Sequence, residues 1–124
     1  MIQLRSKLTV ADNTGARILR VYLIHGGSKR NYGYVGDMVD ASVISAIPNS
    51  AYPAGTKVKA VIVRTRHPYR RPDGSRIRFD DNAGVILSAE TPMDPAGTRI
   101  FGPIAREVKN TGYAKIASLA EEVL

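Results

Sequence analysis

The chain has 124 residues, and its 18 Lys and Arg against 11 Asp and Glu give a net charge of +7. With 44% hydrophobic residues it can bury the core of one domain, which excludes a disordered polycation, and the basic surplus indicates an anionic partner such as nucleic acid, an anionic membrane face or an acidic protein. The absence of cysteine excludes disulfides, thiolate nucleophiles and zinc knuckles.

Membrane insertion and secretion are not expected. The sequence has no run of 18 apolar residues that could form a spanning helix. The opening twelve residues, MIQLRSKLTVAD, also lack the continuous apolar stretch of a signal peptide. We therefore expect a cytoplasmic protein.

The first part of the chain predicts three β-strands. Residues 7–12 (KLTVAD) alternate apolar and polar side chains and run into the turn formers DNTG. Residues 17–25 (RILRVYLIH) are rich in β-branched and aromatic residues without clear alternation, which predicts a strand buried on both faces. Residues 38–47 (MVDASVISAI) alternate again, and a long turn with two prolines follows.

A glycine-rich segment, GGSKRNYGYVG (residues 26–36), separates the second and third strands. Its glycines permit close backbone approach to a ligand, and Lys29 and Arg30 supply positive charge. Tyr32 and Tyr34 can stack on bases or cover the edge of the core. Two interpretations stay open, a loop that contacts RNA and a plain connector.

The most distinctive stretch is residues 61–79 (VIVRTRHPYRRPDGSRIRF), in which two β-type runs flank the turn Pro72-Asp73-Gly74. The pattern predicts a β-ribbon over residues 64–78 with six arginines and one aspartate, a net +5 of the total +7. Its basic residues are Arg64, Arg66, His67, Arg70, Arg71, Arg76 and Arg78. We refer to residues 64–78 as the basic ribbon.

The arginines of the basic ribbon favour phosphate recognition. A guanidinium group donates two parallel hydrogen bonds to phosphate oxygens, which a lysine cannot do. The alternative is an edge hairpin whose charges prevent sheets from pairing with one another. The electrostatics of nucleic-acid binding favour the first interpretation.

The remainder of the chain predicts two more strands and a short helical part. Residues 57–66 form the fourth strand, which leads into the basic ribbon, and residues 83–87 (AGVIL) form the fifth. The fold class is therefore mainly β: a small five-stranded barrel over about residues 1–100. Pro103 is suited to open a short helix, and the apolar spacing from Tyr113 to Val123 predicts a second one. The helical part therefore covers about residues 103–124, in one domain of 124 residues. The apolar face of the second helix fits the core better than a partner surface.

No constellation of catalytic or metal-binding residues stands out. His25 and His67 lack a second ligand at metal-binding spacing. The acidic pairs at 80–81 and 121–122 are adjacent in sequence, so in a strand they point to opposite faces. We expect no enzyme activity, no cofactor and no metal.

Several blocks of the sequence resemble one known family in the same order. They are VADNTGAR (10–17), the GGS loop, VIVRT (61–65), RRPDGSRIRFDDNA (70–83), GTRIFGPIARE (97–107) and KIASLAEEVL (115–124). The chain resembles the universal large-subunit ribosomal protein fourteen family in its bacterial or organellar form. A free RNA-binding factor or chaperone on a similar barrel is the alternative.

The resemblance implies a structural constituent of the large ribosomal subunit, with a five-stranded barrel, a projecting ribbon and a helical part. It implies contacts with large-subunit rRNA, with small-subunit rRNA at intersubunit bridges and with ribosomal proteins three and nineteen. It also implies that a ribosome-silencing factor docks at Thr98, Arg99 and Lys115. The location is then the ribosome, in the cytoplasm or in an organelle.

Three residues depart from the family pattern: Asp81 replaces glycine, Glu121 replaces proline and Gly84 replaces cysteine or alanine. We expect Asp81 to alter the bend where the ribbon rejoins the barrel. We expect Glu121 to let the last helix continue.

Overall fold

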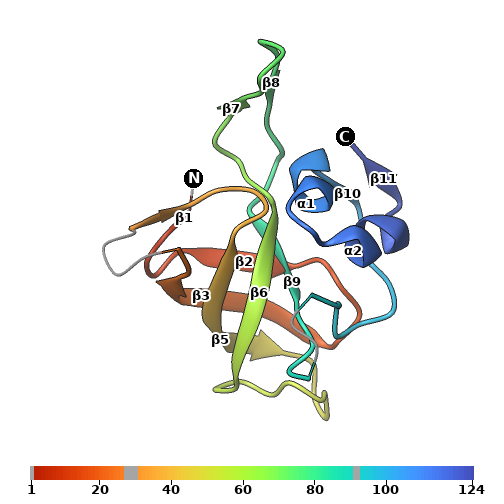
Figure 1. Ribbon diagram of the computed structural model, residues 1–124. Helices are drawn as coiled ribbons and strands as arrows, with labels where there is room; N and C mark the ends of the chain where they lie inside the picture. The colour runs from red at the N-terminus through yellow and green to blue at the C-terminus, as the bar shows by residue number, and fades with distance from the viewer. Residues whose placement is uncertain (1, 27–30, 91–92) are drawn as a thin grey trace.

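A computed structural model describes residues 2–26, 31–90 and 93–124, and at its centre is a closed barrel of five strands (Figure 1). These strands are β2 (Lys7–Val10), β3 (Ala16–Ile24), β5 (Met38–Ala46), β6 (Lys57–Arg64) and β9 (Ala83–Ile86). Their order around the barrel is β2-β3-β5-β6-β9. Neighbouring strands are antiparallel except β2 and β9, whose parallel pairing closes the barrel. The predicted fold class is confirmed.

The barrel interior holds the hydrophobic core. Leu8, Leu19, Val43 and Ile86, from four different strands, are at most 1% exposed. Along β3 and β5, buried positions tend to alternate with exposed ones, as strands with one face on a core require. The barrel therefore offers an outer wall on which polar and aromatic side chains can gather.

The strand β6 is buried on both faces near its carboxyl end. The short strands β1 (Ile2–Gln3) and β4 (Tyr32–Gly33) pair beside it, and the Gly36 N–H donates to the Ile62 carbonyl at 2.8 Å. On the C-terminal side, the Ala105 N–H donates to the Val63 carbonyl at 3.2 Å. Val61, Ile62 and Val63 are each 0% exposed, and a Cβ added at Gly33 of β4 would lie 3.0 Å from Ile62 Cδ1, so both faces of this part of β6 are packed.

The prediction that the second strand is buried on both faces is wrong. Within β3, Tyr22 and Leu23 are each 46% exposed. The β3–β5 register shifts between Val21 and Leu23, which places Tyr22 at an irregularity on the outer wall.

The basic ribbon projects beyond the barrel at the carboxyl end of β6 (Figure 1). Its paired residues form β7 (Tyr69–Arg70) and β8 (Arg76–Ile77), which are antiparallel. Ile77 is half-buried and Phe79 is 7% exposed, whereas Arg76 and Arg78 are exposed, so the predicted alternation holds.

The C-terminal part lies beside the base of the ribbon (Figure 1). It consists of β10 (Pro103–Ile104), α1 (Arg106–Asn110), α2 (Ala114–Leu119) and β11 (Glu122–Val123). Pro103 does not open a helix as expected, because it pairs in parallel with Glu122. The expected continuation of the last helix through Glu121 is also wrong, since α2 ends at Leu119 and Ala120 is extended. Within the described residues no helix has the length and hydropathy of a membrane span.

Candidate nucleic-acid interface

The tip of the basic ribbon is a tight turn with internal hydrogen bonds. Gly74 has φ 92°, a conformation that glycine adopts without steric cost. The Asp73 carboxylate accepts hydrogen bonds from the Ser75 N–H at 2.9 Å and from the Ser75 hydroxyl at 2.6 Å, and these bonds lower the pKa of Asp73. The Gly74 N–H donates to the Arg71 carbonyl at 2.9 Å. The predicted turn is confirmed, and it joins the two strands β7 and β8 of the basic ribbon.

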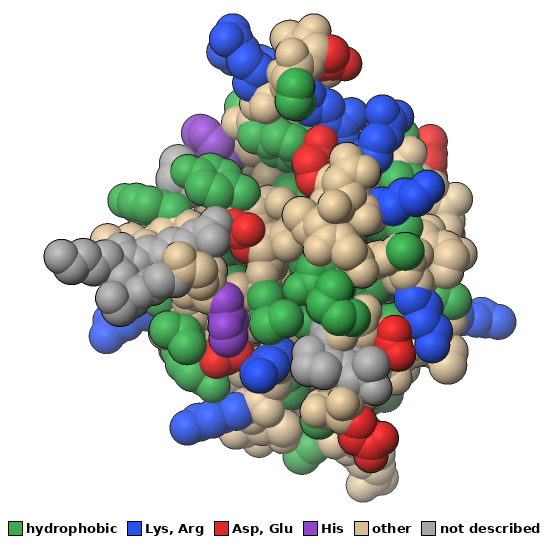
Figure 2. All heavy atoms as spheres, viewed as in Figure 1, with side chains coloured by type: hydrophobic (Ala, Val, Ile, Leu, Met, Phe, Trp, Pro, Cys, Tyr) green, Lys and Arg blue, Asp and Glu red, His purple; other side chains and the backbone are tan. Residues whose placement is uncertain are grey.

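Two arginines face each other across the ribbon. Arg70 of β7 and Arg76 of β8 are direct cross-strand partners, and both are exposed. Like charges in this position destabilise a strand pair unless an anion lies between or above them. Arg66, His67 and Arg78 are exposed as well. Figure 2 shows Lys and Arg side chains gathered over the ribbon at the top of the view.

Arg64 belongs to the interior instead. Its side chain is 10% exposed, and its Nε and Nη2 donate to the Asp81 carboxylate at 3.0 and 3.2 Å. Its Nη1 donates to the carbonyl oxygens of Phe101 at 3.0 Å and Pro103 at 3.1 Å. Four of the five N–H donors of this guanidinium are therefore engaged within the protein. The structure does not bring Arg64 together with the exposed arginines.

Arg71 ties the ribbon to the C-terminal part. Its Nε donates to Glu107 Oε1 at 2.8 Å, its Nη2 donates to Glu107 Oε2 at 3.3 Å, and Nη2 also donates to the carbonyl of Leu124. The Tyr69 hydroxyl donates to the same carboxylate. We call Tyr69, Arg71 and Glu107 the ribbon clamp.

The ribbon clamp shifts the proton affinity of its members. Burial and the bond to the Glu107 carboxylate raise the pKa of Tyr69. Burial alone would raise the pKa of Glu107, but the hydrogen bonds from Tyr69 and Arg71 outweigh it and hold that pKa below its usual range. The clamp is therefore a neutral tyrosine and an arginine that share one ionised carboxylate.

The glycine-rich segment is described in part. Lys29 and Arg30 lie outside the described residues. Tyr32 and Tyr34 are 48% and 50% exposed, so neither is a core residue. The Tyr34 N–H donates to Asp37 Oδ2 at 2.7 Å, which fixes the backbone at this point. Both rings are presented on the surface.

The partner residues expected from the resemblance lie on two segments. Thr98 and Arg99 are exposed, and their N–H groups donate to Asn13 Oδ1 at 2.9 and 3.2 Å, which fixes this loop against the turn after β2. Lys115 on α2 has a side chain 62% exposed, and its Nζ lies 3.9 Å from Asp94 Oδ2. The surface formed by these three residues is polar, and hydrogen bonds to Asn13 hold the Thr98–Arg99 loop in place.

The three departures from the family pattern each have a local consequence. Asp81 receives the guanidinium of Arg64, and Glu121 Oε2 accepts the Gly102 N–H at 3.3 Å. A Cβ added at Gly84 would lie 3.1 Å from Leu8 Cδ1, so the core is closed around the glycine. Sequence reasoning gave no sign of the Arg64–Asp81 pair, because its members are 17 residues apart.

The described residues contain no group of three His, Cys, Asp or Glu side chains that could hold a metal ion. Comparison with known proteins then decides the family. The family model for ribosomal protein L14p/L23e matches residues 1–124. The chain belongs to the L14p/L23e family.

A relative agrees with the L14p/L23e assignment. The large ribosomal subunit protein uL14 of Petrotoga mobilis (strain DSM 10674 / SJ95) is 55% identical over 123 residues, which cover 99% of this chain and 99% of the relative. The resemblance noted in the sequence is thereby confirmed. As a member of the L14p/L23e family, the chain is a structural component of the ribosome and not an enzyme.

Proposed function

We propose that the protein is a structural constituent of the large ribosomal subunit and binds large-subunit rRNA through the basic ribbon. The observation that carries this proposal is the direct pairing of Arg70 with Arg76 on an exposed, projecting strand pair. Two cross-strand guanidinium groups repel each other in the free protein. A phosphate removes that repulsion, so the ribbon is arranged for an anionic partner.

The contact set follows from exposure. Arg66, His67, Arg70, Arg76 and Arg78 are exposed and form the core of the proposed RNA surface. Lys29 and Arg30 of the glycine-rich segment complete the proposed RNA surface, on the basis of their residue type. Arg64 and Arg71 act indirectly, because their donors hold the ribbon base and the ribbon clamp.

A charge-matched comparison tests the proposal. Arg70→Gln/Arg76→Gln removes the facing pair, and Arg17→Gln/Arg20→Gln removes two exposed arginines of β3 as the control. Filter binding to large-subunit rRNA at fixed salt should show a loss of about tenfold or more for the ribbon variant and a clearly smaller loss for the control. Equal losses for both variants would mean that net charge alone drives binding and would overturn the proposal.

Further partners are proposed on the family assignment. These are small-subunit rRNA at intersubunit bridges and ribosomal proteins three and nineteen. The location is the ribosome, in the cytoplasm or in an organelle. Sedimentation with the large subunit after a high-salt wash supports this role, and recovery in the free fraction supports a free RNA-binding factor instead.

We also propose that Thr98, Arg99 and Lys115 form a docking surface for a ribosome-silencing factor. The fixed loop of Thr98 and Arg99 supports a specific protein contact, because bonds to Asn13 reduce the ordering that binding requires. In a pull-down, Arg99→Glu/Lys115→Glu should lose the silencing factor and keep rRNA binding. The ribbon variant Arg70→Gln/Arg76→Gln should show the reverse. Undiminished capture by the first variant would remove the partner surface from this region.

A further inference from the structure

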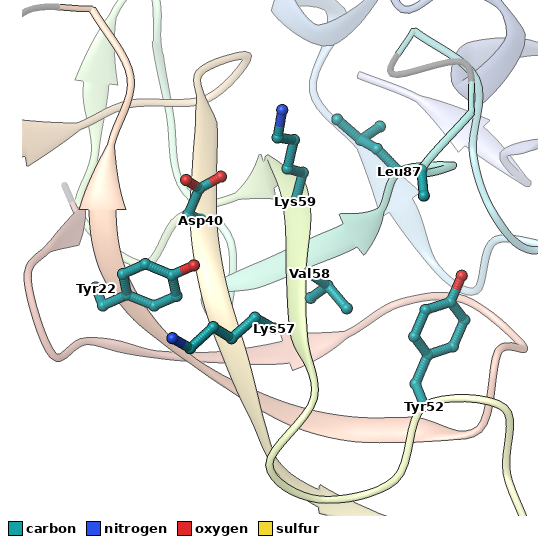
Figure 3. A pocket seen from close by; sticks show the side chains of 8 residues that line it. Tyr22, Asp40, Tyr52, Lys57, Val58, Lys59 and Leu87 are labelled. Carbon is teal, nitrogen blue, oxygen red and sulfur yellow. The ribbon is translucent and has the colours of Figure 1, made fainter.

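A pocket of about 280 Å³ lies on the outer wall of the barrel, away from the ribbon. Figure 3 shows side chains that line it, from β3, β5, β6, the turn before β6 and the segment after β9. They include Tyr22, Asp40, Tyr52, Lys57, Lys59 and Leu87. The volume is at the lower end of the roughly 300–1,000 Å³ typical of small-molecule sites.

Strand pairing explains why these side chains meet. Asp40 of β5 is the direct cross-strand partner of Lys59 in β6. Lys57 lies two residues earlier, and side chains two apart in a strand point to the same side. Tyr22 joins them from β3 at the register shift, and the Lys57 Nζ lies 5.8 Å from the centre of its ring. That distance is within the range of a cation–π contact.

The charges of the pocket leave a positive surplus. Asp40 Oδ1 lies 2.8 Å from His25 Nε2, so the carboxylate already has a hydrogen-bond partner outside the pocket lining. Among the ion pairs of the described residues, none includes Lys57 or Lys59. The Lys57 ammonium thus stands over the Tyr22 ring, and Lys59 lines the same pocket with Tyr52 and the apolar side chain of Leu87. A ligand for this surface combines a flat, weakly polar body with a negative charge.

We propose that this pocket binds one unstacked nucleotide of an RNA strand. The base stacks against Tyr22, which is 46% exposed, and Lys57 and Lys59 contact the adjoining phosphates. Aromatic rings combined with cations are the usual means of holding single-stranded RNA. An acidic peptide satisfies the lysines but makes less use of the exposed ring.

The pocket adds a second contact to the proposed RNA-binding role, and it does so at a different place. Strand β6 begins at Lys57 and ends at Arg64, where the ribbon starts. At about 3.3 Å per residue, roughly 23 Å of strand separates the pocket from the ribbon base. The two contacts therefore touch different parts of an RNA, and they can be removed separately.

NMR titration of the isotope-labelled full chain tests the pocket directly. The probes are uridine 5′-monophosphate, adenosine 5′-monophosphate, uridine and inorganic phosphate. We expect amide shifts in β3, β5 and β6 around Tyr22, Asp40 and Lys57 with both nucleotides, and weaker ones with uridine. Equal shifts from inorganic phosphate, or no shifts at these amides, would overturn the proposal.

Two variants with a matched control define the specificity. Tyr22→Leu should weaken nucleotide binding at the pocket about tenfold, as loss of base stacking does, and Lys57→Gln should weaken the nucleotides more than uridine. Tyr34→Leu, at a ring of similar exposure outside the pocket lining, should leave the shifts unchanged. The same spectra show whether each variant is folded.

The ribbon variant shows whether the pocket binds nucleotides independently of the ribbon. Arg70→Gln/Arg76→Gln should keep the nucleotide shifts at the pocket whether or not it loses affinity for rRNA. If an acidic peptide such as acetyl-Glu-Phe-Glu-amide displaces the nucleotide at equal concentration, the pocket is a protein-binding site and the proposal fails.

Discussion

Arg64 uses its guanidinium to hold the C-terminal segment against the barrel. The side chain is 10% exposed and joins Asp81 to the carbonyl oxygens of Phe101 and Pro103. Without it, two carbonyl oxygens and a carboxylate lose their donors, and unsatisfied polar groups are costly where water has poor access. Arg64 therefore stabilises the fold, although it belongs to the arginine-rich sequence of the basic ribbon.

Arg64→Met should lower the free energy of unfolding by about 2–3 kcal/mol, because hydrogen bonds to charged groups each contribute about 1.5–3 kcal/mol. Urea denaturation at neutral pH measures the change. Arg66→Met, at an exposed position two residues on, is the control and should change stability by no more than about 0.5 kcal/mol. Equal effects for the two variants would contradict the assignment.

Gly74 is expected to set the shape of the ribbon tip. Nothing lies within 4 Å of a Cβ added there, so the cost of Gly74→Val comes from φ 92° and not from a clash. We expect about 3–10-fold weaker rRNA binding and an unfolding free energy within about 1 kcal/mol of the parent, since the tip can fray locally. Gly55 has φ 94° and equally open space, so Gly55→Val is a matched control for strain. Filter binding at equilibrium should show the same rRNA affinity for Gly55→Val as for the parent protein.

The exposed arginines could be predicted from the sequence, because a Pro-Asp-Gly turn between two β-type runs defines a ribbon by local rules. The roles of Arg64 and Arg71 could not. Their carboxylate partners, Asp81 and Glu107, are 17 and 36 residues away, and only the folded chain brings them together. A run of arginines therefore indicates a basic surface without telling which members are free to use it.

At the scale of elements, the ribbon clamp ties the ribbon to the C-terminal part of the chain. The Arg71 and Glu107 side chains are 16% and 29% exposed, so water screens their interaction less than at an open surface. The clamp joins the ribbon to α1, and the Leu124 carbonyl adds the chain end to the same guanidinium. We therefore expect the orientation of the ribbon, the proposed RNA-binding element, to depend on the C-terminal part.

Glu107→Gln should weaken rRNA binding about 2–5-fold although it removes a negative charge. If only net charge mattered, the variant would bind rRNA more tightly, because a less acidic surface attracts RNA more strongly. The control is Glu90→Gln, an exposed acid outside the clamp, which should leave binding unchanged or slightly stronger. Stronger binding by Glu107→Gln would show that the clamp does not orient the ribbon.

The same clamp predicts a pH dependence of stability. The folded-state pKa of Glu107 is lowered, so its contribution is present above its ordinary value of about 4.3 and is lost as the pH falls through the lowered pKa. The folded-state pKa of Tyr69 is raised, so its contribution is present below about 10 and is lost as the pH rises through the raised value. Urea denaturation across pH 2–5 should show a steeper acid loss for the parent than for Glu107→Gln.

Elements with a local signature could be predicted well. The sequence places all five barrel strands within two residues of their ends, because alternation and turn formers are visible in short windows. The pair β10–β11 has no such signature. These two-residue strands pair in parallel after the helices turn the chain back, and the Leu124 N–H donates to the Ile104 carbonyl at 2.9 Å. The helix α2 ends at Leu119, before this pairing begins and against the helical pattern of the sequence.

For the whole molecule, the distribution of charge predicts how binding responds to salt. Four ribbon arginines, Arg66, Arg70, Arg76 and Arg78, are exposed, whereas two are held within the protein. At about 0.7 counterions per phosphate for single strands, the log–log slope from these contacts is roughly −3. Filter binding across a salt series measures it with single-stranded RNA, and a slope near zero would contradict a phosphate contact.

The pocket on the barrel wall was hidden from the sequence for a reason that concerns the whole molecule. Its side chains come from three strands and two connecting segments, so no window of sequence contains them. The apolar composition of residues 17–25 also predicts a buried Tyr22, whereas its side chain is 46% exposed. An exposed aromatic position on a barrel strand is visible only once the closure of the sheet defines inside and outside.

The parallel pairing of β2 with β9 also means that the barrel can close only late while the chain is being synthesised. These strands meet late, since the Ile86 N–H reaches Asp12 Oδ2 across 74 residues of sequence. At roughly 5–20 residues per second, a translating ribosome needs roughly 4–15 s to make that interval. Throughout it the nascent sheet has two unpaired edges, which are prone to associate with other chains. Newly made copies are thus exposed to aggregation until residue 86 has emerged and the barrel has closed.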